Sequence, residues 1–345
     1  MKLRYLNFVA TFGLIFVTVY LFFIGKELLL PLVIALVFWY IIIGVAHGCQ
    51  KIPLYRWHLP RSIALSIAIL GTALVLYAFF FLLAESIANV ITDAPLYQRK
   101  LQEVLDFINK LFGSQLNINE YLSTLNFKLM FSTLAGIVSS IASDFVLILV
   151  YVLFLLLEYQ TFDKKLQTMC KSKEQYHRAN IIRSKITKDI NSYLKIKTTI
   201  NFIAGLLSYV TLIAFGIDYA AFWGIFIFFL HYIPFIGSIS AVVFVLLAVS
   251  VQITTLPLFI LLATLLIIIQ FAVGNILEPK WMGTRLNLSP IVILLSLAFW
   301  GTIWGIPGMF LCIPLMVILN IILAKFPTTA PVAVLLSAEG KIDSE

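Results

Sequence analysis

Long apolar runs separated by short charged segments dominate the pattern of the chain. Five of these runs carry no charged side chain, apart from Asp144 in the fourth, and they cover residues 6–24, 28–46, 62–84, 136–157 and 198–217. Each run has the roughly 20 residues that a helix needs to cross a bilayer. No small-residue cleavage site follows the first run, so we expect it to be retained as a spanning helix.

Two later apolar stretches are too long for single spans. Residues 219–277 and 286–324 contain no Asp, Glu, Lys or Arg. As one straight helix, the second would extend about 58 Å, nearly twice the thickness of the hydrocarbon core. Proline and glycine interrupt both stretches, in HYIPFIGS at 231–238 and in WGIPG at 304–308. At these breaks, backbone N–H and C=O groups lose their helical hydrogen-bond partners. Such groups must be buried in protein or face a cavity. The pattern predicts an all-α transmembrane helical bundle of about eight spans, with broken or re-entrant helices in its C-terminal half.

The break at 231–238 allows two topologies. If residues 219–252 form one kinked span, the loop at 278–285 lies outside the cell. If the chain instead folds back between Pro234 and Gly237, that loop lies inside. Lys280 and Arg285 favour the second arrangement, because loops that carry Lys and Arg tend to stay in the cytoplasm.

The charged segments indicate orientation and regional boundaries. Residues 158–197 contain ten Lys and Arg against four Asp and Glu, whereas 85–128 contain four basic and five acidic residues. The basic segment and the N-terminus should therefore face the cytoplasm. The expected regions are three spans in 1–84, an extracytoplasmic amphipathic segment in 85–135, a fourth span in 136–157, a basic cytoplasmic helical segment in 158–197, a transport core with broken helices in 198–325 and a cytoplasmic tail in 326–345.

Both segments outside the bilayer contain an apolar stripe at helical spacing. The outer stripe is Leu101, Leu105, Ile108 and Phe112, and it needs a cover that a homo-oligomer could supply. The inner stripe is Ile182, Ile186, Ile190 and Tyr193, with Lys and Arg on its flanks. The inner stripe could rest on anionic lipid or pack on the protein itself.

Composition narrows the class of protein. Hydrophobic residues make up 61% and charged residues 12%, the latter about half the share of a soluble domain. The net charge of +8 lies mostly between apolar runs, so it records orientation and does not indicate nucleic-acid binding. Cys49, Cys170 and Cys312 are too widely spaced for a metal site or a disulfide framework. We expect no enzyme activity, no metal and no cofactor.

Polar groups in or beside the spans are the candidate functional residues, because they are costly in a membrane. Asp144 and His231 could bind a coupling cation or proton, or act as an interfacial carboxylate and a hydrogen-bonding histidine. The densest group is GNILEPKWMG at 274–283, followed by Arg285. It could form a gate or a solute mouth, or a short loop in which Glu278 pairs with Arg285. The candidate pathway residues are His231, Pro234, Gly237, Gln270, Asn275, Glu278, Arg285, Gly305 and Gly308.

The segment from Gln270 to Pro314 resembles the autoinducer-2 exporter family of bacterial membrane proteins. The matching runs are GNILEPKWMG, LNLSP at 286–290, LLSLAFWG at 294–301, GIPGMFLCIP at 305–314 and, upstream, YIPFIG at 232–237. The order of spans and charged segments matches over nearly the whole chain. Two positions depart from the family pattern: His231 lies where Asn is frequent, and Gly274 where many relatives have an acidic residue.

This resemblance implies a multi-pass transporter of the bacterial inner membrane that exports a small polar solute past broken helices. Exchange of sodium or lithium for protons is the alternative within the same family. A membrane scaffold without transport activity is the alternative from another class. The expected partners are the lipid bilayer, a small polar solute or cation and further copies of the chain, without nucleic acid.

Overall fold

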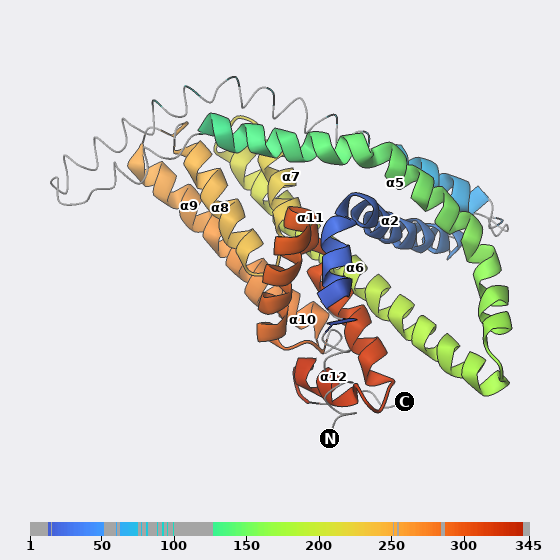
Figure 1. Ribbon diagram of the computed structural model, residues 1–345. Helices are drawn as coiled ribbons and strands as arrows, with labels where there is room; N and C mark the ends of the chain where they lie inside the picture. Colours follow the sequence, from blue (N-terminus) through green and yellow to red (C-terminus); the bar gives the residue numbers. More distant parts are fainter. Residues whose placement is uncertain are drawn as a thin grey trace. The chain divides into compact units, whose positions relative to one another are not determined.

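The computed structural model describes residues 13–51 apart from position 15, residue 60, residues 63–74 with single positions up to 99, and residues 127–340 apart from 251, 254 and 284–286. All the regular elements in these ranges are helices, which confirms the all-α class (Figure 1). They are α2 (Lys26–Lys51), α5 (Phe127–Met169), α6 (Lys173–Ala214), α7 (Ala220–Leu230), α8 (Ile236–Val249), α9 (Leu256–Phe271), the π-helix η1 (Ala272–Leu277), α10 (Glu278–Met282), α11 (Pro290–Ala324) and α12 (Ala330–Leu336).

The described helices carry the apolar lengths of a multi-pass membrane protein. Four of them are long and apolar enough to cross a membrane, and a fifth qualifies if the bent α5 counts as one span. The predicted spans at 6–24 and 62–84 are described only over residues 13–24 apart from 15, and over residues 63–74, 77 and 81, which are mainly helical. The predicted number of about eight spans therefore rests partly on residues outside the described ranges.

The chain forms two compact units. Unit 1 comprises Met1–Pro53, Asp144–Tyr193 and Thr284–Glu345, and unit 2 comprises Leu54–Ser143 and Leu194–Gly283. The boundary between them falls within α5 and again within α6, after Tyr193. Each unit contains one of the two proline-glycine breaks.

The break in unit 2 is a fold-back between α7 and α8. The rings of Phe226 and Phe244 lie 5.8 Å apart, although eighteen residues of straight helix would separate them by about 27 Å. A Cβ atom on Gly237 would lie 1.8 Å from the carbonyl oxygen of Leu230, so only glycine fits where the two arms meet. The α7 and α8 helices are therefore antiparallel arms of a hairpin, as the second of the two predicted topologies requires.

The break in unit 1 is a second hairpin, within α11. Gly305 has the non-helical angles φ 65° and ψ −145°, a conformation that favours glycine. Across this turn the Ser296 hydroxyl donates a hydrogen bond to the carbonyl oxygen of Cys312 over 3.3 Å. A Cβ atom on Gly308 would lie 2.1 Å from the carbonyl oxygen of Trp300. The apolar stretch that is too long for one span is accommodated by folding back on itself.

Unit 2 is held together by close contact between backbones. A Cβ atom on Gly205 of α6 would lie 2.6 Å from the carbonyl oxygen of Gly224 in α7. Small residues allow such an approach in membrane helices. The buried core then forms from the second half of α6 with α7, α8 and α9, and it includes Trp223 and Phe222. Figure 1 shows α7, α8 and α9 side by side.

The helix α6 is continuous through position 197, where the sequence suggested the end of a cytoplasmic segment. The predicted inner stripe lies in its first half, and Ile190 and Tyr193 are each only 3% exposed. Tyr40 of α2 is hydrogen-bonded to Thr187 on the same part of α6. The end of the inner stripe therefore packs on protein. The predicted outer stripe, residues 101–112, lies outside the described ranges.

Candidate functional site

The second half of α6 has a polar face turned into unit 2 and an apolar face turned outward. Lys197, Asn201 and Ser208 are at most 2% exposed, and their spacing of four and seven residues places them on one side of the helix. The opposite side exposes large apolar side chains, namely Phe202, Leu206, Val210 and Ile213. A polar interior behind an apolar surface is expected of a protein that carries polar solutes through lipid.

A π-helical turn brings Glu278 to this polar face. The α9 helix buries Leu262, Leu266 and Gln270 at intervals of four residues. In a regular α-helix Glu278 would lie about 80° away from Gln270 around the axis. The π-helix η1 adds one residue to its turn, which rotates the residues that follow back by about one helical step. Glu278 is thereby turned toward α6.

The carboxylate of Glu278 forms an ion pair with the ammonium group of Lys197. The side chain of Lys197 is 3% exposed and that of Glu278 is 23% exposed. Membrane-embedded charges are costly unless they are paired, so the pair neutralises the deepest charge described in unit 2. Lys197 is therefore a partner of Glu278 that the sequence did not predict. Arg285, the partner expected in the short-loop alternative, lies outside the described ranges, so that pairing stays a prediction.

The tip of the α7–α8 hairpin adds polar groups at the same end of unit 2. The hydroxyl groups of Tyr232 and Thr198 are hydrogen-bonded over 2.7 Å. His231 is 3% exposed, and the charge of Lys197 acts on its ring. Neither ring nitrogen of His231 has a hydrogen-bond partner among the described residues. We call Lys197, His231 and Glu278 the charged cluster.

Further amides lie deeper along α6. The side-chain nitrogen of Gln270 donates a hydrogen bond to the Ser208 hydroxyl over 3.1 Å, which links α9 to α6. Asn201 is fully buried, and both polar atoms of its side chain lack a partner within the described part of the chain. An unsatisfied buried polar group costs about 1–3 kcal/mol and calls for a water, an ion or a ligand. From Lys197 to Ser208 the polar face extends about 16 Å along α6.

Backbone strain marks the hairpin tip. Phe235 has φ 59° and ψ −56°, and the Ile236 amide donates a hydrogen bond to the carbonyl oxygen of Pro234 over 2.6 Å. This is the rare γ-turn that costs of order 1–3 kcal/mol for a residue other than glycine. Such strain is commonly found at binding sites and moving segments.

The chain is similar to known proteins over most of its length. The family model described as AI-2E family transporter matches residues 11–328. The chain belongs to the AI-2E transporter family. The AI-2 transport protein TqsA of Escherichia coli is 30% identical over 91% of this chain and 90% of its own length. Two relatives are provisionally named transport proteins: YhhT of E. coli, 28% identical over 76% of this chain and 77% of its own, and a protein of Haemophilus influenzae, 38% identical over 59% and 57%.

Membership in the AI-2E transporter family identifies the chain as a membrane transporter, and it confirms the resemblance seen in the sequence. The scaffold alternative has no support from these relatives. Their transport names agree with the expectation that the chain is not an enzyme. Within the described residues, no group of three His, Cys, Asp or Glu side chains could hold a metal ion.

The structure brings some of the predicted pathway residues together and separates others. His231, Gln270 and Glu278 line the polar interior of unit 2, and Pro234 and Gly237 build the hairpin tip beside them. Asn275 lies in η1 with an exposed side chain. The remaining described candidates, half-buried Asp144 with Gly305 and Gly308, belong to unit 1.

Sequence reasoning missed Lys197, Asn201 and Ser208. The sequence pattern places Lys197 at a regional boundary and Asn201 and Ser208 in an ordinary span. Their common signal is the spacing of polar residues along α6, at positions 197, 201 and 208, which repeats on one helical face.

Proposed function

We propose that the chain exports a small polar solute of the autoinducer-2 type across the bacterial inner membrane, along the polar face of α6. The observation that carries this proposal is Asn201, a buried amide whose donor and acceptor both lack partners among the described residues. A solute with hydroxyl and carbonyl groups could supply both. The name of the relative TqsA supports autoinducer-2 as the first solute to test.

In this proposal, the charged cluster controls access to the polar face. The charges of Lys197 and Glu278 neutralise each other, so the entrance carries no net charge from this pair. This suits a solute that has no net charge itself. Pro234 and Gly237 shape the break that presents His231, and Gly305 and Gly308 shape the second break in unit 1. Arg285, Asn275 and Gln270 are proposed as further pathway or gate residues. Discontinuous helices of this kind form the binding sites of many secondary transporters.

Flux into liposomes that contain the purified protein tests the proposal. Asn201→Leu keeps the branched shape of the side chain, adds some volume and removes its donor and acceptor, so we expect at least a tenfold loss of autoinducer-2 flux in a protein that still folds. Thr264→Val is the matched control, because Thr264 lies on the exposed side of α9 and its hydroxyl bonds only to the Ile260 carbonyl. Equal flux in wild type and Asn201→Leu would refute the proposed site.

The same vesicles separate the second candidate function, exchange of sodium or lithium for protons. The observation that favours it is His231, a buried titratable ring with both nitrogens unpartnered within the described residues; Asp144 is the other proposed coupling residue. An imposed sodium or lithium gradient should then collapse a preset pH difference. His231→Asn should abolish this response, because asparagine keeps hydrogen-bonding groups but does not titrate. A pH difference that persists in wild-type vesicles excludes exchange.

The proposed orientation places the charged cluster at the cytoplasmic side with the N-terminus. Support comes from the excess of Lys and Arg in 158–197, which leads directly into Lys197. Labelling of a cysteine at position 281 from each side of the membrane tests this. Labelling only from the extracytoplasmic side would reverse the orientation.

A further inference from the structure

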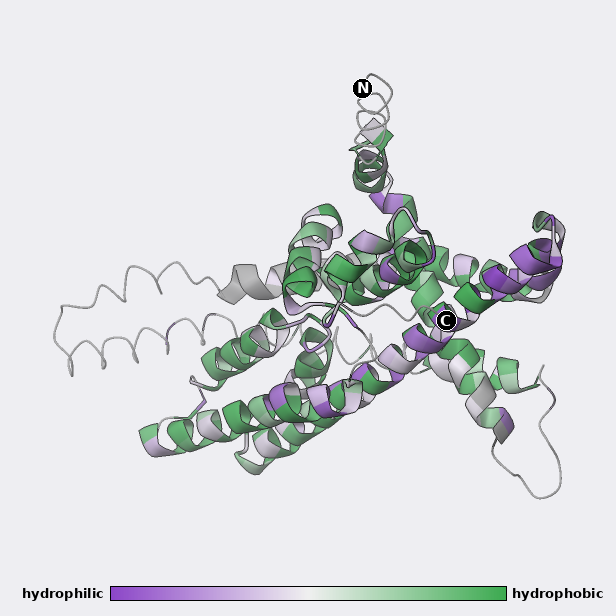
Figure 2. Ribbon diagram, turned by 90° about the horizontal axis from the view of Figure 1, so that it is seen from below, coloured by the Kyte–Doolittle hydropathy of each residue, from purple (hydrophilic) through white to green (hydrophobic). Residues whose placement is uncertain are grey.

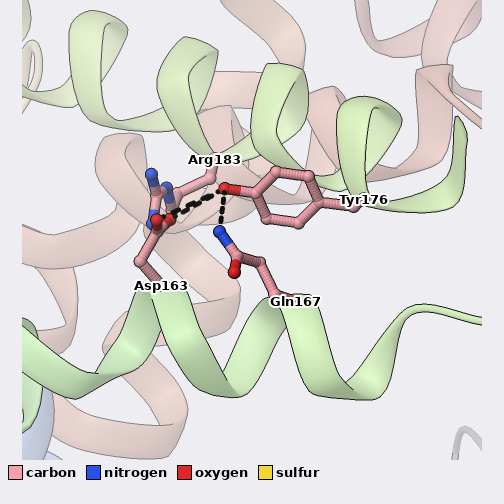
Figure 3. A network of polar contacts seen from close by, with 4 residues as sticks. All are labelled: Asp163, Gln167, Tyr176 and Arg183. Carbon is pink, nitrogen blue, oxygen red and sulfur yellow. Dashed lines mark hydrogen bonds and ion pairs between the residues drawn. The ribbon is translucent and has the colours of Figure 1, made fainter. Parts of the chain in front are cut away.

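The turn between α5 and α6 carries a second polar structure, which the transport proposal does not use. We call residues 161–188 the basic arm: the last part of α5, the turn and the first part of α6. Asp163 accepts hydrogen bonds from the Tyr176 hydroxyl at 3.2 and 3.3 Å and from Arg183 at 3.0 Å. Gln167 donates to the same Tyr176 oxygen over 3.3 Å (Figure 3). These bonds join the two helices into one antiparallel arm.

The arm carries a large excess of positive charge. It contains eight Lys and Arg against two acidic residues, and Asp163 is occupied by Arg183. Hydrophilic residues gather on this hairpin at the right of Figure 2. The exposed cations are Lys164, Lys171, Lys173, Arg178 and Lys188, together with Lys165, which forms an ion pair with Glu158. Such a cluster attracts an anionic surface within about 10 Å at moderate salt.

Exposed apolar side chains accompany the cations. Met169 is 79% exposed and Phe162 is 45% exposed. They are seven residues apart, so they lie on one side of the helix. Long apolar side chains among exposed lysines are typical of segments that lie in a membrane interface.

The direction of the arm agrees with such a position. The apolar helix Ser143–Tyr159 and the helix Thr161–Met169 meet at an angle of 64°. Spanning helices are tilted on average about 20° from the bilayer normal. If the span has this average tilt, the arm leaves the bilayer at no more than about 45° from the membrane plane.

From these three observations we propose that the basic arm binds the headgroups of anionic phospholipids in the leaflet from which it emerges. Lysines at the turn contact phosphate groups, and Phe162 and Met169 enter the interfacial region. The buried Ile190 and Tyr193 keep the other side of α6 on the protein, which leaves the exposed side to face lipid. This binding is independent of the solute that the protein carries.

Cys170 lies at the turn and is half-buried, so it provides a labelling position in the full-length protein. With Cys49 and Cys312 replaced by alanine, a fluorophore on Cys170 is measured in vesicles containing a lipid that carries a quencher near its headgroup. Pure phosphatidylcholine vesicles are compared with vesicles that also contain phosphatidylglycerol. We expect quenching to increase with phosphatidylglycerol and to fall at high salt.

Charge removal then tests which residues are responsible. Each lysine near an anionic surface contributes roughly fivefold in equilibrium constant, so Lys171→Gln with Lys173→Gln should weaken arm binding by about 25-fold. Lys26→Gln with Lys195→Gln removes the same charge outside the arm and should change nothing. Equal quenching in both lipid compositions overturns the proposal, as does equal loss in the control pair. Quenching only by a water-soluble quencher means that the arm faces solvent or a soluble partner, which also overturns it.

Discussion

Replacing Glu278 by glutamine removes the negative charge that neutralises Lys197. The side chain of Lys197 is 3% exposed, so water cannot replace the lost carboxylate without a local opening. Loss of one partner from a buried ion pair costs about 3–5 kcal/mol. Because the side chain of Glu278 is 23% exposed, we expect the lower end of that range, about 3 kcal/mol.

A double variant separates stability from transport. Lys197→Met with Glu278→Leu removes both charges and keeps similar volumes, and such replacements are often neutral or stabilising. We therefore expect the double variant to unfold within about 1 kcal/mol of wild type, whereas Glu278→Gln alone is less stable. If the pair opens and closes during transport, the stable double variant should still lose flux.

Thermal unfolding in detergent and flux in liposomes are the two assays. A single Glu278→Gln variant as stable as wild type would refute the buried pairing. A double variant that loses as much stability as the two single variants added together would refute it as well. Wild-type flux in the double variant would make the ion pair a structural element only.

The hairpin tip gives two further predictions. Gly237→Ala places a Cβ atom 1.8 Å from the Leu230 carbonyl oxygen and should lower the unfolding free energy by about 3 kcal/mol or more. Gly274→Ala is the control, because its new Cβ has no atom within 4 Å, and its unfolding free energy should not change. Phe235→Gly removes the strain of the positive φ but adds conformational entropy to the unfolded chain. The net effect should be a rise of about 1 kcal/mol in the unfolding free energy. Detergent unfolding measures each effect, and a destabilised Phe235→Gly variant would contradict the strained turn.

Much of the fold follows from apolar length and from proline and glycine. The stretch at 286–324 is too long for one span, so a break was predicted, and the chain folds back at Gly305 within it. For the stretch at 219–277 the sequence allowed two alternatives, one kinked span or a hairpin, because the length of the stretch fits both. The contact between Phe226 and Phe244 distinguishes them, and such contacts between distant residues are not encoded in local sequence.

The candidate site was harder to predict than the fold, and Lys197 explains why. It ends a segment with ten basic residues, where a lysine normally marks the cytoplasmic side and remains in water. Only the continuity of α6 through this position, together with the π-turn that rotates Glu278, makes it an interior residue. A π-turn has no sequence signature as simple as proline or glycine, so the partner of Glu278 could not be deduced.

The two hairpins also share a short sequence motif, which occurs once in each unit. The tetrapeptide Ala-Phe-Trp-Gly occurs at 221–224 in the first arm of the α7–α8 hairpin and at 298–301 in the first arm of the α11 hairpin. An Ile-Pro pair follows each, with Pro234 eleven residues after Trp223 and Pro307 seven residues after Trp300. The difference of four residues is close to one helical turn, so the arm in unit 2 is one turn longer before the same kind of break. His231 and Tyr232 follow this longer arm at the hairpin tip, and they join the polar interior of unit 2. Both units thus reverse a helix in lipid with the same kind of break, and the tip of the hairpin in unit 2 adds polar residues to the candidate site.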